Sequence, residues 1–513
     1  MRAKIASALQ VWSPDLIEAR AVSSGIAALL EKDVRRFQSS VVRACCAALI
    51  ATLGTASCAG GSSSATTGST LPSWLATAAG SGSGGSSNYI SHVVVVIQEN
   101  RSFDDLFATF PGADGATEGM EKLPSGDQYV PLKEVDLASP CDWGHSWRTY
   151  IKDWDKGKMD AFNLEGGGVK CPGKAGTAVY QYVNPSEIGP YWTLAQQYVL
   201  ADHTFQTQGS GSYTAHQDLI RGGTTIDESQ SESLVDFPSH HPWGCDSPPG
   251  TVTSLLISKP HKPLKREYDK GPFPCTNDFP SSGSYYETLA DLLDANSVSW
   301  TYYSPPVTGG TGGLWNAFDT ISAVRNGPEW KTNIRDTTKL FSDISSGNLA
   351  NVSWIVPDDV NSDHPGDGKD LGPSWVASVV NAVGESSYWN STAIIVVWDD
   401  WGGFYDNMSP PLKDRWGGLG FRVPMLVVSP YAREGKSGPG LVEHQQYEFG
   451  SILKFIENIW GLGQLGTTDT RATSIIDCFD FTQQPRQFQE IGSSHSRAFF
   501  EHQKPSYLPV DSE

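Results

Sequence analysis

HVVVVIQEN, residues 92–100, is an apolar run that ends in a carboxylate and an amide. The same pattern returns much later in the chain as AIIVVWDD, residues 393–400. Each run is too short to span a membrane and too apolar for an edge strand, which is typical of a central strand covered on both faces. In open α/β sheets, ligands bind beyond the carboxyl ends of such strands. The two strand ends therefore predict one site for a hard metal ion.

The rest of the pattern favours an α/β fold. Further buried strands are expected at residues 198–201, 299–303, 352–356 and 425–428, and helices at residues 375–383 and 451–460. Gly461 is the expected stop of the second helix. Strands that alternate with helices indicate a mostly parallel sheet. Two Gly-, Pro- and Ser-rich segments, residues 110–175 and 225–290, are expected to be insertions that roof the site.

The composition limits the classes of function. The chain has 513 residues, of which 39% are hydrophobic, so it can bury a large core. Its formal net charge of −20 opposes binding to nucleic acid and electrostatic docking on anionic lipid, because both present phosphates. An anionic substrate would need a local positive centre, such as a metal ion.

The amino terminus has the features of an export signal. Arg35, Arg36 and Arg43 precede an uncharged stretch, residues 44–54, that has the length of a signal peptide. Small residues then lead to Cys58, in a pattern that resembles a bacterial lipoprotein cleavage site. Ordinary signal cleavage nearby is the alternative.

These features predict three regions along the chain. Residues 1–58 form an export segment whose last residue, Cys58, would be lipidated and attach the protein to a membrane. Residues 59–88 are a Gly/Ser-rich flexible linker. Residues 89–513 form the catalytic domain. The protein is expected to be exported, as a periplasmic or outer-surface lipoprotein or in secreted form.

Five cysteines follow the export segment: Cys141, Cys171, Cys245, Cys275 and Cys478. An exported protein can form disulfides. Sequence alone leaves several connectivities open. Nearest neighbours give Cys141–Cys171 and Cys245–Cys275 as the expected bonds, with Cys478 free.

Four oxygen-bearing side chains follow the two opening strands: Glu99, Asn100, Asp399 and Asp400. Oxygen ligands suit Ca²⁺, Mg²⁺ or Mn²⁺ and do not exclude Zn²⁺. The alternative is that Asp399 and Asp400 lie in a solvated turn and that Glu99 and Asn100 start a helix. Two such pairs, each after a buried run, favour a divalent metal site.

A Gly/Ser turn followed by a short helical pattern, residues 205–217, holds the candidate nucleophile. Backbone N–H groups at a helix start favour an anionic phosphate. A metal ion beside the serine hydroxyl would favour its alkoxide. By spacing alone, Ser210 and Ser212 compete, and a plain helix cap is the alternative for either.

Two histidines also stand near expected strand ends or loops. His145 lies in CDWGHSW, residues 141–147, and His364 lies in SDHP, residues 362–365. A histidine in such a position can hold a phosphoryl oxygen or protonate a leaving group. The alternative for each is a purely structural role.

Several motifs, in order, resemble the bacterial phosphoesterase family of acid phosphatases and phosphatidylcholine-type phospholipases C, within the alkaline phosphatase superfamily. They are VVIQENRSFDDLF, CDWGHSW, GSYTAHQ, SDHP, VVWDDWGGFYDN, FRVPMLVVSPYA and EHQQYEFGSILKFIENIWGL. The resemblance implies an alkaline phosphatase-like three-layer α/β sandwich with a mostly parallel central sheet and loop-rich insertions.

The resemblance also assigns roles. It maps Glu99, Asn100, Asp399 and Asp400 onto metal ligands, although many members have Glu in place of Asp400. Ser212 falls on the nucleophile, where phospholipase-type members usually have Thr. His145 and His364 fall on positions that contact the phosphoryl group. Asp363, beside His364, is expected to orient that histidine or to approach the metal.

The expected function is a metal-dependent phosphoric ester hydrolase that forms a phosphoserine intermediate. Its substrate would be a phosphate monoester, as for an acid phosphatase. The alternative is a phospholipase C that acts on phosphatidylcholine-type phosphodiesters. A non-catalytic, anion-binding surface lipoprotein is a third reading. A serine carboxylesterase is not favoured, because no Gly-x-Ser-x-Gly elbow is present in strand–turn–helix context.

Overall fold

The computed structural model describes residues 89–510, apart from 140, 169, 260–264, 268–274, 276–285, 308–312, 367, 416, 507 and 509. The predicted export segment, residues 1–58 with Cys58, and the predicted linker, residues 59–88, lie outside the described residues. The described body begins at Tyr89, next to the first strand.

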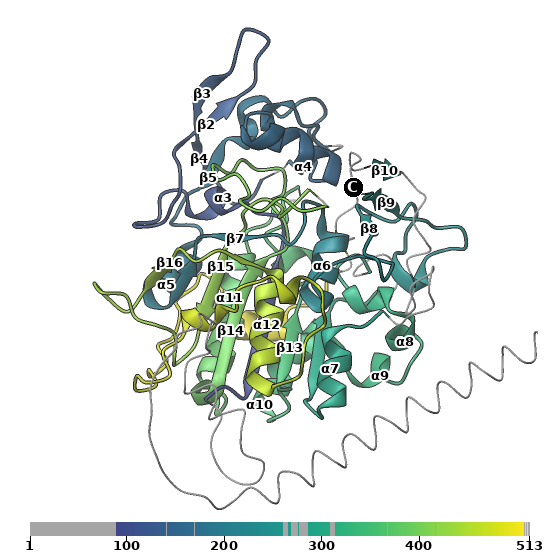
Figure 1. The fold of residues 1–513 in the computed structure, drawn as a ribbon. Coiled ribbons are helices and arrows are strands. Elements are labelled where there is room, and N and C mark those ends of the chain that lie inside the picture. Colours follow the sequence, from purple (N-terminus) through teal and green to yellow (C-terminus); the bar gives the residue numbers. More distant parts are fainter. Residues whose placement is uncertain are drawn as a thin grey trace, which may run out of the picture. The chain divides into compact units, whose positions relative to one another are not determined.

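A central sheet of eight strands forms the core of this body (Figure 1). In sheet order the strands are β12 (Ile334–Asp336), β11 (Trp300–Ser304), β13 (Val352–Ile355), β1 (His92–Gln98), β14 (Thr392–Trp398), β15 (Met425–Val428), β6 (Val199–Ala201) and β16 (Leu441–Glu443). Strand β15 runs antiparallel to both neighbours, and all other pairs in the sheet are parallel. The predicted α/β fold with a mostly parallel central sheet is confirmed.

The two opening sequence runs lie side by side in the middle of this sheet. Strand β1 pairs in parallel with β14 from His92 opposite Thr392 to Gln98 opposite Trp398. Every residue of β14, and every residue of β1 after His92, is buried. Strands that are buried on both faces carry continuous apolar runs rather than alternation, because both side-chain rows meet a covering layer.

Helices supply that covering. They are α3 (Phe103–Phe107), α4 (Trp147–Trp154), α5 (Gly189–Gln197), α6 (Ser212–Arg221), α7 (Leu289–Ala295), α8 (Ser322–Arg325), α9 (Glu329–Thr332), α10 (Leu340–Ser345), α11 (Gly372–Gly384), α12 (Phe449–Trp460) and α13 (Arg497–His502). Helix α12 packs against α6, and α11 packs against α5, α10 and α13. None of the helices in the described part of the chain is long and apolar enough to cross a bilayer.

The ends of the two predicted helices follow their local chemistry. Helix α11 begins at Gly372, before the predicted start, because Pro373 is tolerated in the first turn of a helix. Helix α12 ends where predicted, at Gly461. This residue has φ +62°, a left-handed conformation that glycine adopts without a steric cost.

The predicted insertions supply most of the strands of three small sheets, to which β5, just after the first insertion, also contributes. Strands β2 (Glu118–Glu121) and β3 (Gln128–Pro131) pair with each other, β4 (Lys133–Val135) pairs with β5 (Gln181–Val183), and β8 (Glu232–Val235), β9 (Ser254–Ile257) and β10 (Lys265–Glu267) form a third sheet. In Figure 1 these strands lie beyond the upper end of the central sheet. A further pair joins β7 (Thr204–Phe205) to β17 (Tyr447–Glu448).

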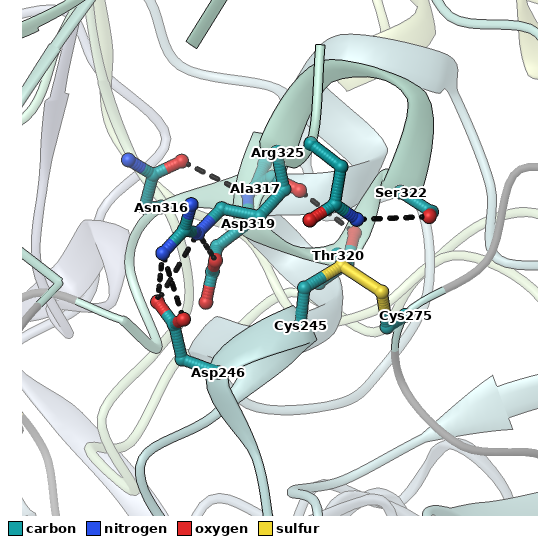
Figure 2. The surroundings of a disulfide bond; sticks show 10 residues. Cys245, Asp246, Cys275, Asn316, Ala317, Asp319, Thr320, Ser322 and Arg325 are labelled. Carbon is teal, nitrogen blue, oxygen red and sulfur yellow. Dashed lines mark hydrogen bonds and ion pairs between the residues drawn. A yellow bond between two sulfur atoms is a disulfide. The ribbon is translucent and has the colours of Figure 1, made fainter.

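Both predicted disulfides are present. Cys141 is bonded to Cys171 and Cys245 to Cys275, and Cys478 is free and buried. Figure 2 shows the second bond, with Arg325 reaching toward two carboxylates beside it.

Candidate active site

The carboxyl ends of β1 and β14 bring the four predicted metal ligands together. Because Gln98 pairs with Trp398, the residues that follow each strand emerge next to each other. The Asp399 N–H donates to the Gln98 carbonyl at 3.0 Å, and the Asn100 N–H donates to Asp399 Oδ1 at 2.9 Å. All four side chains, those of Glu99, Asn100, Asp399 and Asp400, are fully buried.

Backbone conformation helps to form this corner. Asn100 has φ +54°, in the left-handed region that asparagine tolerates better than most residues. Gly402 has φ +60°, and a Cβ added there would lie 2.2 Å from the Asn100 carbonyl oxygen. A glycine is therefore required at position 402 for the two loops to approach each other.

Ser212 is the serine that lies beside the predicted ligands. It is the first residue of α6, and its Oγ lies 3.2 Å from Asp400 Oδ2 and 3.4 Å from Glu99 Oε2. Ser210 is equally buried, but its Oγ accepts a hydrogen bond from the Asp236 N–H at 2.9 Å. The geometry therefore separates two serines between which spacing could not decide.

His216 joins the cluster, although it was not among the predicted ligands. Its Nε2 lies 2.9 Å from Glu99 Oε1 and 3.9 Å from Asp399 Oδ2. Burial lowers the pKa of His216 to about 4, so the ring is neutral at pH 7, which is the form that binds a metal. His216 lies four residues after Ser212 on one helix face, a spacing that could have revealed it.

His145 and His364 direct the same ring atom toward Asn100. The Nδ1–H of His145 donates to the Trp143 carbonyl at 2.8 Å, and that of His364 donates to the Pro365 carbonyl at 2.6 Å. These bonds leave Nε2 of each ring facing the site.

The Asn100 amide makes the best hydrogen bonds when its nitrogen points toward two carboxylates and its oxygen toward both histidines. In this orientation the nitrogen lies 3.0 Å from Glu99 Oε2 and 3.2 Å from Asp399 Oδ1. The oxygen lies 3.1 Å from His145 Nε2 and 3.3 Å from His364 Nε2. Each ring then donates from both nitrogens, which is the cationic form that can hold a phosphoryl oxygen or release a proton.

Asp363 makes its hydrogen bonds to other residues than its neighbour His364 does. One carboxylate oxygen accepts hydrogen bonds from the Tyr191 hydroxyl at 2.8 Å and from Trp398 Nε1 at 3.0 Å. Its carbonyl oxygen accepts from Arg101 Nε at 2.9 Å. Burial raises the pKa of Asp363 to about 6. These contacts hold the loop that carries His364 against the end of β14.

The residues present fit a divalent metal ion. One donor atom from each of Glu99, His216 and Asp399 lies within 4.8 Å of the other two. Asp399 Oδ2 is buried and has no hydrogen-bond partner among the described residues. A buried carboxylate oxygen without a partner is costly unless a proton or a cation compensates it.

Comparison with known proteins gives consistent results. The sequence profile of the Phosphoesterase family matches residues 90–463. The chain is 24% identical over 430 residues to the non-hemolytic phospholipase C of Pseudomonas aeruginosa, covering 73% of this chain and 54% of that protein. It is 26% identical over 457 residues to phospholipase C B of Mycobacterium tuberculosis, with coverages of 77% and 78%. The chain thus spans about half the length of the Pseudomonas relative.

Solved structures with low sequence identity are also similar. One is a protein in the alkaline phosphatase superfamily from Vibrio parahaemolyticus, with a TM-score of 0.35, 11% identity and coverages of 76% of this chain and 73% of that chain. Another is the lipoteichoic acid synthase LtaP from Listeria monocytogenes, with a TM-score of 0.32, 10% identity and coverages of 78% and 82%. The family match spans most of the described body and includes every predicted site residue, and so the chain belongs to the phosphoesterase family.

Proposed function

We propose that this protein hydrolyses phosphoric esters with Ser212 as its nucleophile and a divalent metal ion as its cofactor. One observation carries the proposal. Ser212 Oγ lies 3.2 Å from Asp400 Oδ2 at the start of a ten-residue helix, beside a buried set of potential metal ligands. Backbone N–H groups at a helix start and a nearby cation both favour a bound phosphoryl group.

Glu99, His216 and Asp399 are the residues that would hold the metal, with Asn100 and Asp400 next to them. A bound divalent ion would neutralise the phosphoryl oxygens and favour the ionised form of the serine hydroxyl. This set keeps Glu99 and Asp399 of the four predicted ligands, adds His216, and leaves Asn100 and Asp400 beside the ion.

The protein groups can complete the reaction in two steps. Ser212 Oγ attacks phosphorus as its proton passes to Asp400 Oδ2, and the bond from phosphorus to the leaving oxygen breaks. His145 or His364 donates the proton on Nε2 to that oxygen. Water then attacks the phosphoserine and gives a proton to the same histidine. The bond from phosphorus to Ser212 Oγ breaks, phosphate leaves, and Asp400 returns its proton to Ser212 Oγ, which regenerates the serine. Positioning and charge neutralisation supply most of the rate in such reactions.

The substrate we place first is a phospholipid-type phosphodiester. The curated relatives named above are phospholipases C from two bacteria, and one of them aligns over most of its length. A phosphate monoester is the second candidate. It is favoured by serine at position 212, where the resemblance leads one to expect threonine in phospholipase-type members.

The test compares p-nitrophenylphosphorylcholine with p-nitrophenyl phosphate for the wild type and two matched serine variants. Ser212→Ala is expected to lower kcat roughly a thousandfold or more on the preferred ester and to leave the fold intact. Ser210→Ala is the control, because Ser210 is equally buried but bonded to Asp236. It is expected to keep kcat within a few-fold.

Turnover of the diester would establish the first substrate class, and turnover of the monoester alone would establish the second. Mass spectrometry of acid-quenched enzyme should find phosphate on the peptide that contains Ser212. Full activity of Ser212→Ala on both esters would refute the assignment of the nucleophile.

We also propose that the protein is exported and anchored through Cys58. The two disulfides support an oxidising compartment. Cys58→Ala should move the protein from the membrane fraction to the soluble fraction of the cell envelope. A wild-type protein that is already in the soluble fraction, and whose distribution does not change with Cys58→Ala, would show that ordinary signal cleavage operates instead.

A further inference from the structure

A second cluster of metal-binding side chains lies at the opposite edge of the sheet from β12. Asp202 and His203 follow β6, His444 follows β16, and Asp114 lies in the chain after α3. One donor atom from each of the four lies within 4.8 Å of the others. These residues take no part in the proposed reaction.

The contacts within the cluster are short. His203 Nε2 lies 2.8 Å from Asp114 Oδ2, and His444 Nδ1 lies 2.9 Å from Asp202 Oδ2. Cross contacts complete the group, with His203 Nε2 3.9 Å from Asp202 Oδ1 and His444 Nδ1 3.9 Å from Asp114 Oδ2. Nε2 of His203 and Nδ1 of His444 therefore each face both carboxylates.

Regular structure fixes most of this arrangement. The parallel pairing of β6 with β16 sets Ala201 opposite Glu443, so Asp202 and His444 emerge side by side. The His203 carbonyl accepts a hydrogen bond from the Tyr447 N–H at 2.9 Å. The Asp114 N–H donates to Asp202 Oδ2 at 2.9 Å, which holds the fourth member against the sheet edge. A metal ion would thus find its ligands already positioned.

Charge and exposure also suit a cation. The Asp202 side chain is fully buried, and in the described residues the only basic side chains within 4.0 Å of its carboxylate are these two histidines. Arg422 lies nearby, but its Nη1 donates to the backbone carbonyls of Asp114 and Asp202. The side chains of Asp114 and His444 are 54% and 51% exposed, which leaves a path from solvent.

We propose that Asp114, Asp202, His203 and His444 bind a divalent transition metal ion, with zinc favoured, separately from the catalytic site. Two imidazoles and two carboxylates match the ligand types and number of a four-coordinate zinc site, and the carboxylates neutralise its charge. In the sheet, β6 lies two strand spacings from β14, roughly 10 Å, and β16 lies three, roughly 14 Å, so the two sites are separate.

Such an ion would be structural. It would tie the chain after α3 to the ends of β6 and β16, near the path that leads from β7 to Ser212. At a free zinc concentration one hundred times the dissociation constant, the ratio of folded to unfolded protein should rise about a hundredfold.

The test counts zinc in the full-length protein by competition with a chromophoric chelator. The His216→Ala background removes a proposed ligand of the catalytic ion, so any tightly bound equivalent that remains reports the second site. We expect one equivalent in this background, and none after the further change His444→Ala or Asp114→Asn. His502→Ala is the control, since His502 is exposed and lies outside both clusters.

Circular dichroism tests whether each variant is folded. Asp114→Asn is chosen because it removes the charge of an exposed side chain and keeps its size. Cobalt substituted in the His216→Ala protein should give the visible bands of a tetrahedral site, and these should disappear in His203→Ala. Two results would overturn the proposal: a folded His216→Ala protein that binds no zinc, or retention of that equivalent when His444 and Asp114 are changed together.

Discussion

The two disulfides allow a paired test of how His145 is positioned. Each bond joins cysteines 30 residues apart. In the chain-entropy account, removal of a cross-link that closes a loop of this length costs about 3.7 kcal/mol at 25 °C. The replacements Cys141→Ser/Cys171→Ser and Cys245→Ser/Cys275→Ser should therefore lower the free energy of unfolding by similar amounts.

Their effects on activity should differ. The Cys141–Cys171 bond joins two segments that also pair with each other, through Trp143 and Gly167. On these segments the Gly144 N–H donates to the Gly166 carbonyl at 3.0 Å. The Trp143 carbonyl in turn fixes Nδ1 of His145. Loss of this bond should let His145 move and should lower kcat tenfold or more.

The Cys245–Cys275 bond has other neighbours. Next to it, Arg325 contacts Asp246 at 2.8 Å and Asp319 at 3.1 Å (Figure 2). Its removal should leave kcat within about threefold at a temperature where the protein stays folded. Guanidinium unfolding followed by tryptophan fluorescence measures stability, and ester hydrolysis measures kcat. Equal losses of kcat in the two variants would refute the link between the first bond and His145.

Three further predictions follow from the buried charges and the proposed metal. Burial and the Asp246 carboxylate raise the pKa of Asp319 to about 8. The protonated Asp319 carboxyl therefore stabilises the fold fully below about pH 4, and this stabilisation is lost as the pH rises toward 8. Urea unfolding at a series of pH values should show this loss in the wild type but not in Asp319→Asn. Chelation should abolish ester hydrolysis, and added divalent ion should restore it in the wild type but far less in His216→Ala, as measured by initial rates. Arg422→Met should lower the free energy of unfolding by about 3–5 kcal/mol in denaturant titrations, because it leaves the Asp104 and Asp406 carboxylates buried without their cation.

The central strands were predictable because their physical signal is local. A run such as residues 93–97 is apolar at every position, and only a strand covered on both faces removes all of those side chains from water. The stop at Gly461 was also local, since it depends on one residue that adopts positive φ easily. Several motifs that occur in order carry the resemblance to the family, and this resemblance pointed to Ser212 as the nucleophile.

Other features depended on contacts between distant segments. Ser210 and Ser212 are alike in sequence, and only the approach of α6 to the ends of β1 and β14 gives the second serine its carboxylate neighbours. His216 became a candidate ligand for the same reason, because its distance to Glu99 depends on how the helix packs against the sheet.

The sequence by itself therefore determined the strand cores, the helix stop, the strand-end carboxylates and the family. Each of these is encoded within a short stretch of residues. Only the tertiary structure decided that His216 joins these carboxylates and that Asp114, Asp202, His203 and His444 meet at a sheet edge. It also shows the contacts that set Ser212, to which the resemblance pointed, apart from Ser210. The physical reason is that parallel strands align residues by register, so side chains far apart in sequence become neighbours only when the sheet forms.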